Sequence, residues 1–514
     1  MIAKVLSAAI WGIEAHLIEV EVDISSQGLP FLSIVGLPDL AVKESKDRLR
    51  AAIKNTGFIF PAKKMTINLA PADLKKEGAH FDLPMALGIL AADGSVSSEL
   101  LQQYLIVGEV SLDGRIKEVR GALPMAILAK RLGLKGMIVP FKNGREAAVV
   151  SGIEVLGVET LPQLAGFLNG EQKLSHIECS IDSFFIEKPI YEEDFADVRG
   201  QAHAKRALTI AASGGHNILM VGPPGSGKTM LAKRFPGILP TMTFEEAIDA
   251  TKIHSIYGTL SSDSSLLVIR PYRSPHHTIS DAGLIGGGPT PRPGEVSLAH
   301  SGVLFLDELP EFRRNVLEVL RQPMEDGQVT IARATASLTY PARFLLIAAM
   351  NPCPCGYFTD PTRNCVCSQI AVERYRSKIS GPLLDRIDIH IEVPAVPFME
   401  LTTEVGEEGS DVIRARVYAA REIQKKRYQQ EGILCNAALR PKQMRRFCAL
   451  NDGSRKLIEL AMERLGFSAR AYNRILKIAR TIADLAERES IIASDIAEAI
   501  QYRSLDRKLF ATMP

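Results

Sequence analysis

Short apolar runs separated by turns dominate the first part of the chain. Runs at 17–22, 65–69 and 104–110 have the length and the turn-bounded character of β-strands, and helix-like stretches lie between them. From about residue 170 to 191 the sequence becomes polar and irregular, which is typical of a linker. We therefore predict an α/β or α+β domain over residues 1–172.

A second α/β segment is predicted over residues 190–396. Its strongest apolar runs read as strands buried in a parallel sheet: 217–221, 302–306 and 344–350. The stretch 405–410 marks another break. Beyond it the apolar residues recur at helical spacing, so we predict a helical domain over residues 411–514.

The size and composition of the chain agree with this division. At 514 residues the chain is too long for one core, and about three domains are expected. The net charge of +2 is nearly neutral, so any surface that binds nucleic acid has to be local. The sequence has no membrane-length apolar stretch, no cleavable leader and only seven cysteines, so we expect a cytoplasmic protein without a membrane partner.

A phosphate-binding loop follows the apolar run that ends at Val221. The pattern G-x-x-x-x-G-K-[ST] is complete in Gly222, Pro223, Pro224, Gly225, Ser226, Gly227, Lys228 and Thr229. Its glycines let backbone N–H groups close around a β-phosphate, Lys228 reaches the β- and γ-phosphates, and Thr229 can ligate Mg²⁺. A surface glycine turn is the alternative, but the preceding strand favours a site for ATP and Mg²⁺.

Polar residues at the ends of the next two buried strands can complete a hydrolytic site. Asp307 can hold Mg²⁺ through water, and Glu308 can polarise the attacking water. We expect the strand that ends in these acids to lie side by side with the strand of the phosphate loop. Asn351 can hydrogen-bond the water or the γ-phosphate, although an Asn before a proline is also a common turn residue.

Two arginines are candidates for sensing or stabilising the phosphates. Arg386 can be donated from a neighbouring subunit to neutralise charge on the transferring phosphoryl group. The alternative for Arg386 is a salt bridge with Asp385 or Asp388. Arg470 is predicted at the start of a helix, from which it can report the nucleotide state to the C-terminal domain.

The order of these parts resembles the magnesium-chelatase-like group of AAA+ ATPases. Within that group, 270–278 and 293–300 look like characteristic stretches of the YifB/ComM family, and the resemblance covers essentially the whole chain. It implies an N-terminal domain of the ribosomal-S5-domain-2 or Lon-like fold, a central AAA+ P-loop domain and a C-terminal helical lid. It also implies a ring, a homo-hexamer, that uses ATP to move DNA. Members that resemble ComM are branch-migration helicases that help to integrate single-stranded DNA in natural transformation.

The resemblance implies that two insertions face a central pore. One spans about 250–300, and the other is a hairpin before the strand that ends at Asn351. The sequence also predicts this hairpin, because Asp326-Gly327 is turn-like and 328–333 alternates before 336–340. Arg333, Arg270 and Arg273 could contact DNA phosphates from these insertions, or they could brace subunit interfaces. We expect the pair His276 and His277 to be hydrogen-bonded locally.

Four thiols lie close together just after Asn351. Cys353, Cys355, Cys365 and Cys367 suit a structural Zn²⁺ site, because thiolates are preferred ligands of this ion. Paired C-x-C spacing strains a shared metal, so four reduced cysteines without a metal stay open as the alternative.

The N-terminal segment resembles the proteolytic domain of Lon without its catalytic pair. His80 stands where the serine nucleophile is expected, and Leu123 stands where the lysine is expected. We therefore predict a Lon-like fold without peptidase activity. It could serve oligomerisation or DNA binding through surface lysines, or those lysines could simply be solvated: Lys63, Lys64, Lys75 and Lys76.

Three functions compete at this point. The leading one is an ATP-dependent DNA translocase or branch-migration helicase. A chelatase-type motor that remodels a protein partner is the second. An ATP-dependent protease is the third, and the residues at positions 80 and 123 count against it.

Overall fold

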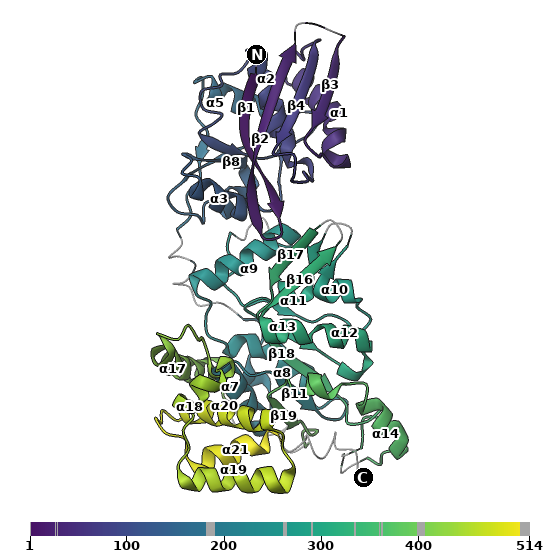
Figure 1. Cartoon of the computed structure of the whole chain (residues 1–514), viewed down its shortest axis with the longest axis vertical. Helices are drawn as coiled ribbons and strands as arrows, with labels where there is room; N and C mark the ends of the chain where they lie inside the picture. Colours follow the sequence, from purple (N-terminus) through teal and green to yellow (C-terminus); the bar gives the residue numbers. More distant parts are fainter. Residues whose placement is uncertain are drawn as a thin grey trace. The chain divides into compact units, whose positions relative to one another are not determined.

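The computed structural model of the chain forms two compact units (Figure 1). It describes residues 2–25, 27, 29–180, 184, 191–260, 265–288, 291–333, 336–358, 360, 363–397 and 407–503. Unit 1 comprises Met1–Lys188 and Phe244–Val268, and unit 2 comprises Pro189–Thr243 and Ile269–Pro514.

Unit 1 is built on a mixed sheet of eight strands in the order β10-β9-β8-β5-β1-β2-β4-β3. The strands are β1 Ile2–Trp11, β2 Glu14–Ser25, β3 Phe31–Val35, β4 Lys64–Ala70, β5 Tyr104–Ile106, β8 Gly136–Pro140, β9 Glu154–Val158 and β10 Ser175–His176. A small hairpin pairs β6 (Glu109–Val110) with β7 (Ile116–Lys117). The helices are α1 Leu40–Asn55, α2 Asp82–Ala92, α3 Ala122–Arg131, α4 Gly144–Ala147 and α5 Leu161–Leu168.

The core of unit 1 follows from the pattern of its apolar residues. In β4, Met65, Ile67 and Leu69 alternate with more exposed residues and are buried on one face of the sheet. After its first residue, Asp82, helix α2 is apolar on all sides, and every one of its residues is buried. Gly88 permits this close packing, because a Cβ atom there would lie 2.5 Å from Cγ2 of Val22.

Residues 244–268 belong to unit 1 by their packing, although the sequence analysis placed them in the domain at 190–396. Ser255, on helix α9 (Phe244–Tyr257), donates a hydrogen bond to the Glu146 carboxylate and accepts one of 3.0 Å from the Gly121 amide. Glu146 also accepts a 2.8 Å hydrogen bond from the Leu123 amide, and burial raises the pKa of its carboxyl group. This buried polar cluster ties α9 to α3 and α4.

Unit 2 contains a parallel sheet of five strands in the order β12-β15-β18-β11-β19. The strands are β11 Ile218–Val221, β12 Tyr272–Arg273, β15 Val303–Leu306, β18 Leu345–Met350 and β19 Ile389–Glu392. The expectation that β11 and β15 lie side by side is wrong, because β18 pairs with both and separates them. A parallel sheet places its most continuously apolar strands at the centre, and β18 is such a strand.

Helices and short hairpins surround this sheet. The helices are α7 Ala202–Gly214, α8 Lys228–Arg234, α10 Asp281–Ile285, α11 Glu295–Leu298, α12 Arg314–Val319, α13 Arg321–Asp326, α14 Gln369–Arg376 and α15 Gly381–Leu384. Strands β13 (Gly286–Gly287) and β14 (Arg292–Pro293) form one antiparallel pair. The predicted hairpin is confirmed, since β16 (Gln328–Arg333) pairs antiparallel with β17 (Ala336–Pro341) after a left-handed Gly327.

The C-terminal part of unit 2 is helical, as predicted. It comprises α17 Ser410–Tyr428, α18 Pro441–Phe447, α19 Asp452–Leu465, α20 Ala469–Leu485 and α21 Ala493–Gln501. Ile475, Ile478 and Ile482 of α20 share one apolar core with buried residues of α7 and of the sheet. The predicted α/β fold class, with a parallel-sheet core and a helical C-terminal part, is thereby confirmed. None of the helices in the described ranges has the length and apolar character that crossing a bilayer requires.

Candidate nucleotide site

The phosphate loop joins the end of β11 to the start of α8. Gly225 and Gly227 have φ angles of +77° and +89°, in the left-handed region that favours glycine. Gly222 lies so close to β19 that a Cβ atom would be 2.0 Å from the carbonyl oxygen of Val393. The loop thus has the backbone that its glycines predicted, and helix α8 begins at Lys228.

Lys228 is buried within this loop. Its ammonium group donates hydrogen bonds of 2.8 Å to the carbonyl oxygens of Gly222 and of Pro223, and its Nζ lies 3.3 Å from Oδ1 of Asn351. Burial lowers the pKa of Lys228 to about 8, while the nearby carboxylates of Asp307 and Glu308 oppose that shift. The amine is therefore placed among the groups that the sequence assigned to phosphate binding.

Thr229 and Asp307 meet although they are 78 positions apart. The Thr229 hydroxyl donates a 2.7 Å hydrogen bond to Oδ2 of Asp307, at the end of β15. A hydroxyl and a carboxylate side by side supply the oxygen donors that Mg²⁺ prefers. The donor set of this chain therefore fits the ion that the loop pattern implies.

Glu308 occupies an unusual backbone conformation next to this pair. Its φ and ψ angles of 53° and 45° are left-handed, which is uncommon for a residue other than glycine and is often found at functional sites. Its side chain is exposed, and Oε2 lies 3.3 Å from Nδ1 of His277.

The contact with Glu308 corrects our interpretation of the histidine pair. His276 is bonded locally, 2.9 Å from the Thr278 hydroxyl, as expected. His277 instead pairs with Glu308, because the chain just beyond β12 reaches the same edge of the sheet as the end of β15. The sequence signal was the position of His277 shortly after Tyr272–Arg273, a run too short to be identified as a strand by its pattern.

Asn351 completes the group. It follows β18 directly, and Met350 is paired in parallel with Val221, the residue before the loop. The ends of β11, β15 and β18 thus bring Lys228, Asp307 and Asn351 to one edge of the sheet, where parallel strands present their carboxyl ends.

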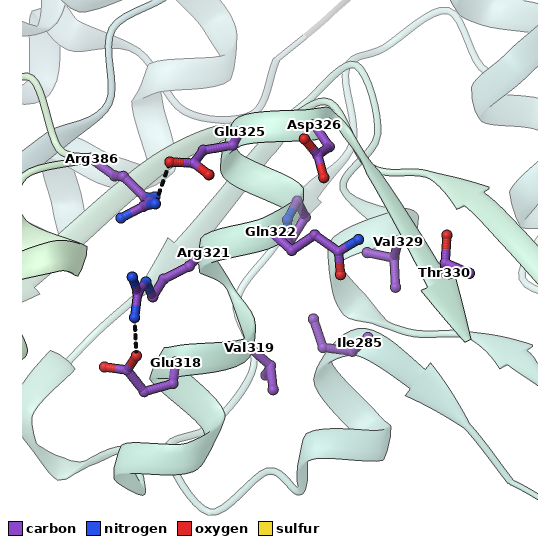
Figure 2. A pocket seen from close by; sticks show the side chains of 11 residues that line it. Ile285, Glu318, Val319, Arg321, Gln322, Glu325, Asp326, Val329, Thr330 and Arg386 are labelled. Carbon is purple, nitrogen blue, oxygen red and sulfur yellow. Dashed lines mark hydrogen bonds and ion pairs between the residues drawn. The ribbon is translucent and has the colours of Figure 1, made fainter. Parts of the chain in front are cut away.

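Arg386 and Arg470 lie apart from this group. Among the described residues, neither arginine has a hydrogen bond or ion pair with residues 222–229. Arg386 pairs with Glu325 of α13, on the same chain (Figure 2). The expected alternative partners of Arg386 are wrong, since Asp385 pairs with Arg470 at 3.4 Å and Asp388 with Arg474 at 3.2 Å.

A cavity of about 560 Å³, lined by both polar and apolar side chains, includes the Arg386–Glu325 pair in its wall (Figure 2). The guanidinium of Arg321 in its wall pairs with Glu318 at 2.7 Å. No residue of the phosphate loop lines this cavity. The cavity is therefore a feature of the α12–α13 face rather than the site for a triphosphate.

The arginines proposed to contact DNA are mostly engaged within the chain. Arg270 donates hydrogen bonds of 2.6 Å to the carbonyl oxygens of Pro240 and Ser301. Arg273 forms a two-point pair with Glu295, with distances of 2.6 and 2.7 Å. Both arginines thus stabilise their own subunit. The backbone of Arg333 ends β16, and its side chain lies outside the described residues.

The N-terminal lysines differ among themselves. Lys76 is fully buried, and its ammonium group donates to the carbonyl of Pro71, so the expectation that it lies at the surface is wrong. Burial lowers the pKa of Lys76. Lys75 pairs with Glu77 at 2.6 Å, Lys63 lies 3.8 Å from Asp93, and Lys64 is exposed at the start of β4.

The two positions that correspond to the Lon catalytic pair hold other chemistry. His80, in the short 3₁₀ turn Ala79–Phe81 before α2, lies 3.0 Å from the carbonyl oxygen of Ala8, and burial lowers its pKa to about 4. Leu123 is buried in α3. A neutral histidine and a leucine cannot act as the serine and lysine of that mechanism.

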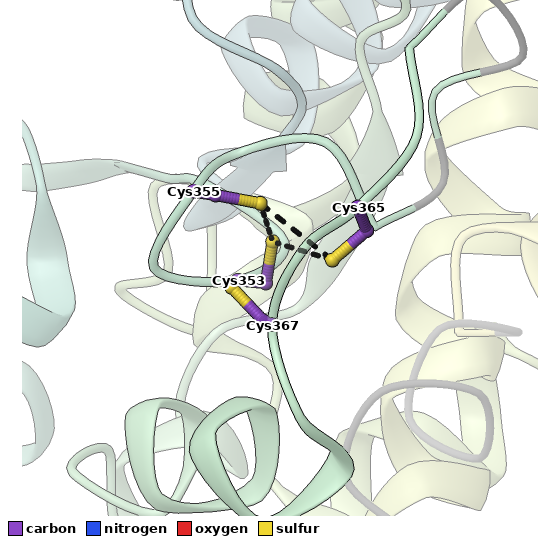
Figure 3. Close-up of side chains that lie close together, drawn as sticks. All are labelled: Cys353, Cys355, Cys365 and Cys367. Atoms are coloured by element: carbon purple, nitrogen blue, oxygen red, sulfur yellow. Dashed lines mark hydrogen bonds between the residues drawn. The ribbon is translucent and has the colours of Figure 1, made fainter.

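The four clustered cysteines are brought together (Figure 3). Their sulfur atoms all lie within 4.8 Å of one another, an arrangement compatible with a metal site. The loop that carries them starts two residues after Asn351.

Comparisons with known proteins agree with this geometry. Three family models match in series: "Subunit ChlI of Mg-chelatase" over residues 20–143, "Magnesium chelatase, subunit ChlI" over 194–401 and "Magnesium chelatase, subunit ChlI C-terminal" over 407–503. With the parallel sheet and the phosphate loop, they define a magnesium-chelatase-like AAA+ protein. This class indicates an ATPase that uses ATP and Mg²⁺.

Similarity over the full length places the chain more narrowly. It is 46% identical to the competence protein ComM of Haemophilus influenzae, over 99% of this chain and 98% of that protein. It is 44% identical to the uncharacterized protein YifB of Escherichia coli, over 97% and 96% of the two chains. A shorter match, 29% identity over 118 residues, relates 22% of this chain to 21% of Lon protease 2 of Bacillus subtilis. The chain belongs to the YifB/ComM family.

Proposed function

We propose that this protein is an ATP-dependent DNA translocase that drives branch migration of single-stranded or branched DNA in natural transformation or recombination. The observation that carries the ATPase part is the meeting of Lys228, the Thr229–Asp307 pair, Glu308 and Asn351 at one edge of a parallel sheet. The name of the ComM relative, a competence protein, supports DNA as the material on which the motor acts.

Each residue of the site has a distinct role in this proposal. Lys228 and the loop amides of residues 222–227 bind the phosphates, while Thr229 and Asp307 hold Mg²⁺, which neutralises charge on the β- and γ-phosphates. Glu308 orients and polarises the attacking water. Asn351 hydrogen-bonds the γ-phosphate or that water without adding charge.

The active assembly in this proposal is a cytoplasmic homo-hexamer. Arg386 acts on the nucleotide of the neighbouring subunit, and Arg470 reports nucleotide state to the C-terminal helices. The hairpin of β16 and β17 contacts DNA phosphates in the ring. In this proposal the domain predicted at 1–172 is a Lon-like domain without peptidase activity. The domain at 190–396 is the AAA+ ATPase, and the domain at 411–514 is its helical lid.

A chelatase-type motor that acts on a protein partner is the second candidate, because all three family models carry the name of a magnesium-chelatase subunit. The two functions differ in what stimulates hydrolysis. A chelatase-type motor is indifferent to DNA, whereas the translocase is stimulated by it, with an affinity for DNA that falls as salt rises. A Lon-like protease is disfavoured by His80 and Leu123.

The test is ATPase activity against a panel of DNA structures, with the mass of the particle measured in the same buffer. We expect stimulation by single-stranded or branched DNA, a hexameric mass with nucleotide, and movement of a labelled three- or four-stranded junction in ATP and Mg²⁺. Glu308→Gln is the matched control, because it should bind ATP and trap it unhydrolysed. A monomeric particle, or hydrolysis that no DNA alters, would rule the translocase out.

A further inference from the structure

The sulfur atoms of the cysteine cluster have the spacing of a tetrahedral metal site. The Sγ atom of Cys353 lies 3.3 Å from that of Cys355 and 3.7 Å from that of Cys365, and the Cys355–Cys365 distance is 3.6 Å (Figure 3). Four sulfurs at ~2.3 Å from one Zn²⁺ are roughly 3.8 Å apart. Disulfide sulfurs are about 2.05 Å apart, and all four cysteines are free.

The backbone shows how Cys353 and Cys355, the first C-x-C pair, reach the same site. Gly356 has a φ angle of +88°, and its amide donates a 3.0 Å hydrogen bond to the carbonyl of Cys353. The chain therefore turns tightly around Cys355. This turn brings the thiols of Cys353 and Cys355 to the same side, facing Cys365.

The same turn packs against the phosphate loop. A Cβ atom on Gly356 would lie 2.4 Å from Cδ of Pro224, so the two loops are in direct contact there. On the other side, the guanidinium of Arg376 in α14 donates a 3.0 Å hydrogen bond to the carbonyl of Pro352 and lies 4.8 Å from the centre of the Phe358 ring. The cysteine loop thus contacts the phosphate loop and continues directly from Asn351.

We propose that Cys353, Cys355, Cys365 and Cys367 bind one Zn²⁺ and that this ion holds their loop closed against Pro224, so that zinc loading sets the affinity of the phosphate loop for nucleotide. The zinc site stands on the sulfur geometry alone, while its effect on nucleotide affinity rests on the proposed ATP site. All four positions are filled by thiolates, which is typical of a structural site. Binding of the ion contributes to the stability of the loop, because the loop has to close to form the site.

The first measurement is the metal content of the full-length protein purified without added metal, by elemental analysis. We expect about one Zn²⁺ per chain, released by a reagent that modifies thiols. Cys365→Ser should lose the zinc, and Cys435→Ser, a matched change at a cysteine outside the cluster, should keep it. A protein without zinc, or one with the visible absorption of an iron–sulfur cluster, would overturn the site.

The second measurement is the affinity for a fluorescent ADP analogue. We expect Cys365→Ser to weaken binding at least about tenfold, and Cys365→His, which restores a zinc ligand, to recover both the metal and most of the affinity. Stripping zinc from the unaltered protein with a chelator and then adding it back should weaken and restore binding in the same way, without any substitution. Unchanged affinity after loss of the metal would overturn the coupling.

Lys228→Ala separates this inference from the proposed ATP site. This variant should lose nucleotide binding and keep its zinc. If the unaltered protein binds zinc but no nucleotide, the assignment of the ATP site fails and the metal site stands.

Discussion

Lys228 needs its proton to attract phosphate, and its burial among the loop carbonyls makes that proton easier to lose. With a pKa lowered to about 8, the free protein loses the ammonium charge as pH rises through 8, while bound phosphates favour the charged form. Affinity for ADP should therefore be constant below pH 8 and fall above it, by up to about tenfold per pH unit. Titrations of a fluorescent analogue between pH 7 and 9.5 measure this.

Lys228→Arg provides the control for that titration, because a guanidinium stays charged over the whole range. If this variant retains binding, its affinity should vary little with pH. An unaltered protein whose affinity is the same at pH 7 and 9.5 would contradict the lowered pKa.

His277 is the residue at the site that the sequence did not indicate. Nδ1 of its ring lies 3.3 Å from Oε2 of Glu308. Removing the ring therefore frees the Glu308 carboxylate to orient water. We expect His277→Ala to raise ATP hydrolysis in the absence of DNA by up to about fivefold, the factor that corresponds to a partly exposed pair worth ~1 kcal/mol. Steady-state ATPase rates with and without DNA measure this. His276→Ala, next to it, should leave both rates unchanged, and a fall in the basal rate of His277→Ala would show that the contact promotes hydrolysis instead.

At the scale of elements, the C-terminal helices are joined by a buried charge cluster around Asp484 of α20. Its carboxylate accepts hydrogen bonds of 2.6 and 2.9 Å from Arg427 of α17, one of 3.1 Å from Arg480 and one of 2.8 Å from Asn436. Asp484→Asn leaves the two guanidinium groups without their counter-charge, so we expect the free energy of unfolding of unit 2 to fall by about 3–5 kcal/mol. Denaturant unfolding measures the change.

Asp452→Asn removes the same charge from an exposed position in the first turn of α19 and serves as the control. We expect it to change stability by less than about 1 kcal/mol. Equal effects of the two substitutions would mean that the Asp484 cluster contributes nothing specific.

The sequence predicted the strands and helices better than it predicted which of them lie next to each other. Polar residues directly after buried strands indicated Asp307 and Asn351, because parallel strands expose their carboxyl ends at one edge, and the phosphate-loop pattern indicated Lys228. The same argument failed for the pairing of β11 with β15, since the separation of two strands along the chain does not fix which strand lies between them. It also missed His277, because β12 has only two residues and no hydrophobic period to identify it. Lys76 was misplaced for a related reason: a lysine beside a charged neighbour looks exposed unless the fold is known.

At the scale of the whole molecule, the proposed ring predicts complementation between inactive subunits. Lys228→Ala disables the nucleotide site of its own chain, and Arg386→Ala disables the site of the neighbour if the arginine acts across the interface. Each variant alone should be inactive, and an equal mixture should regain activity at roughly a quarter of the interfaces, where an intact loop meets an intact arginine. ATPase assays of mixed and unmixed samples measure this.

The interpretation of the mixture depends on one further measurement. Nucleotide binding by Arg386→Ala should be close to that of the unaltered protein, since within the described part of the chain Arg386 has no hydrogen bond or ion pair with the phosphate loop. A mixture that stays as inactive as its components would place Arg386 in its own subunit's chemistry or in folding.

Glu325 gives this arrangement a biological consequence. The Arg386 guanidinium pairs with the Glu325 carboxylate of its own chain, so it can contact a neighbouring subunit only if this pair breaks. In the proposed ring, closure would therefore have to break the Arg386–Glu325 pair, and an isolated chain would keep it. A chain that has not yet assembled would therefore hydrolyse little ATP, and hydrolysis would be confined to complete rings.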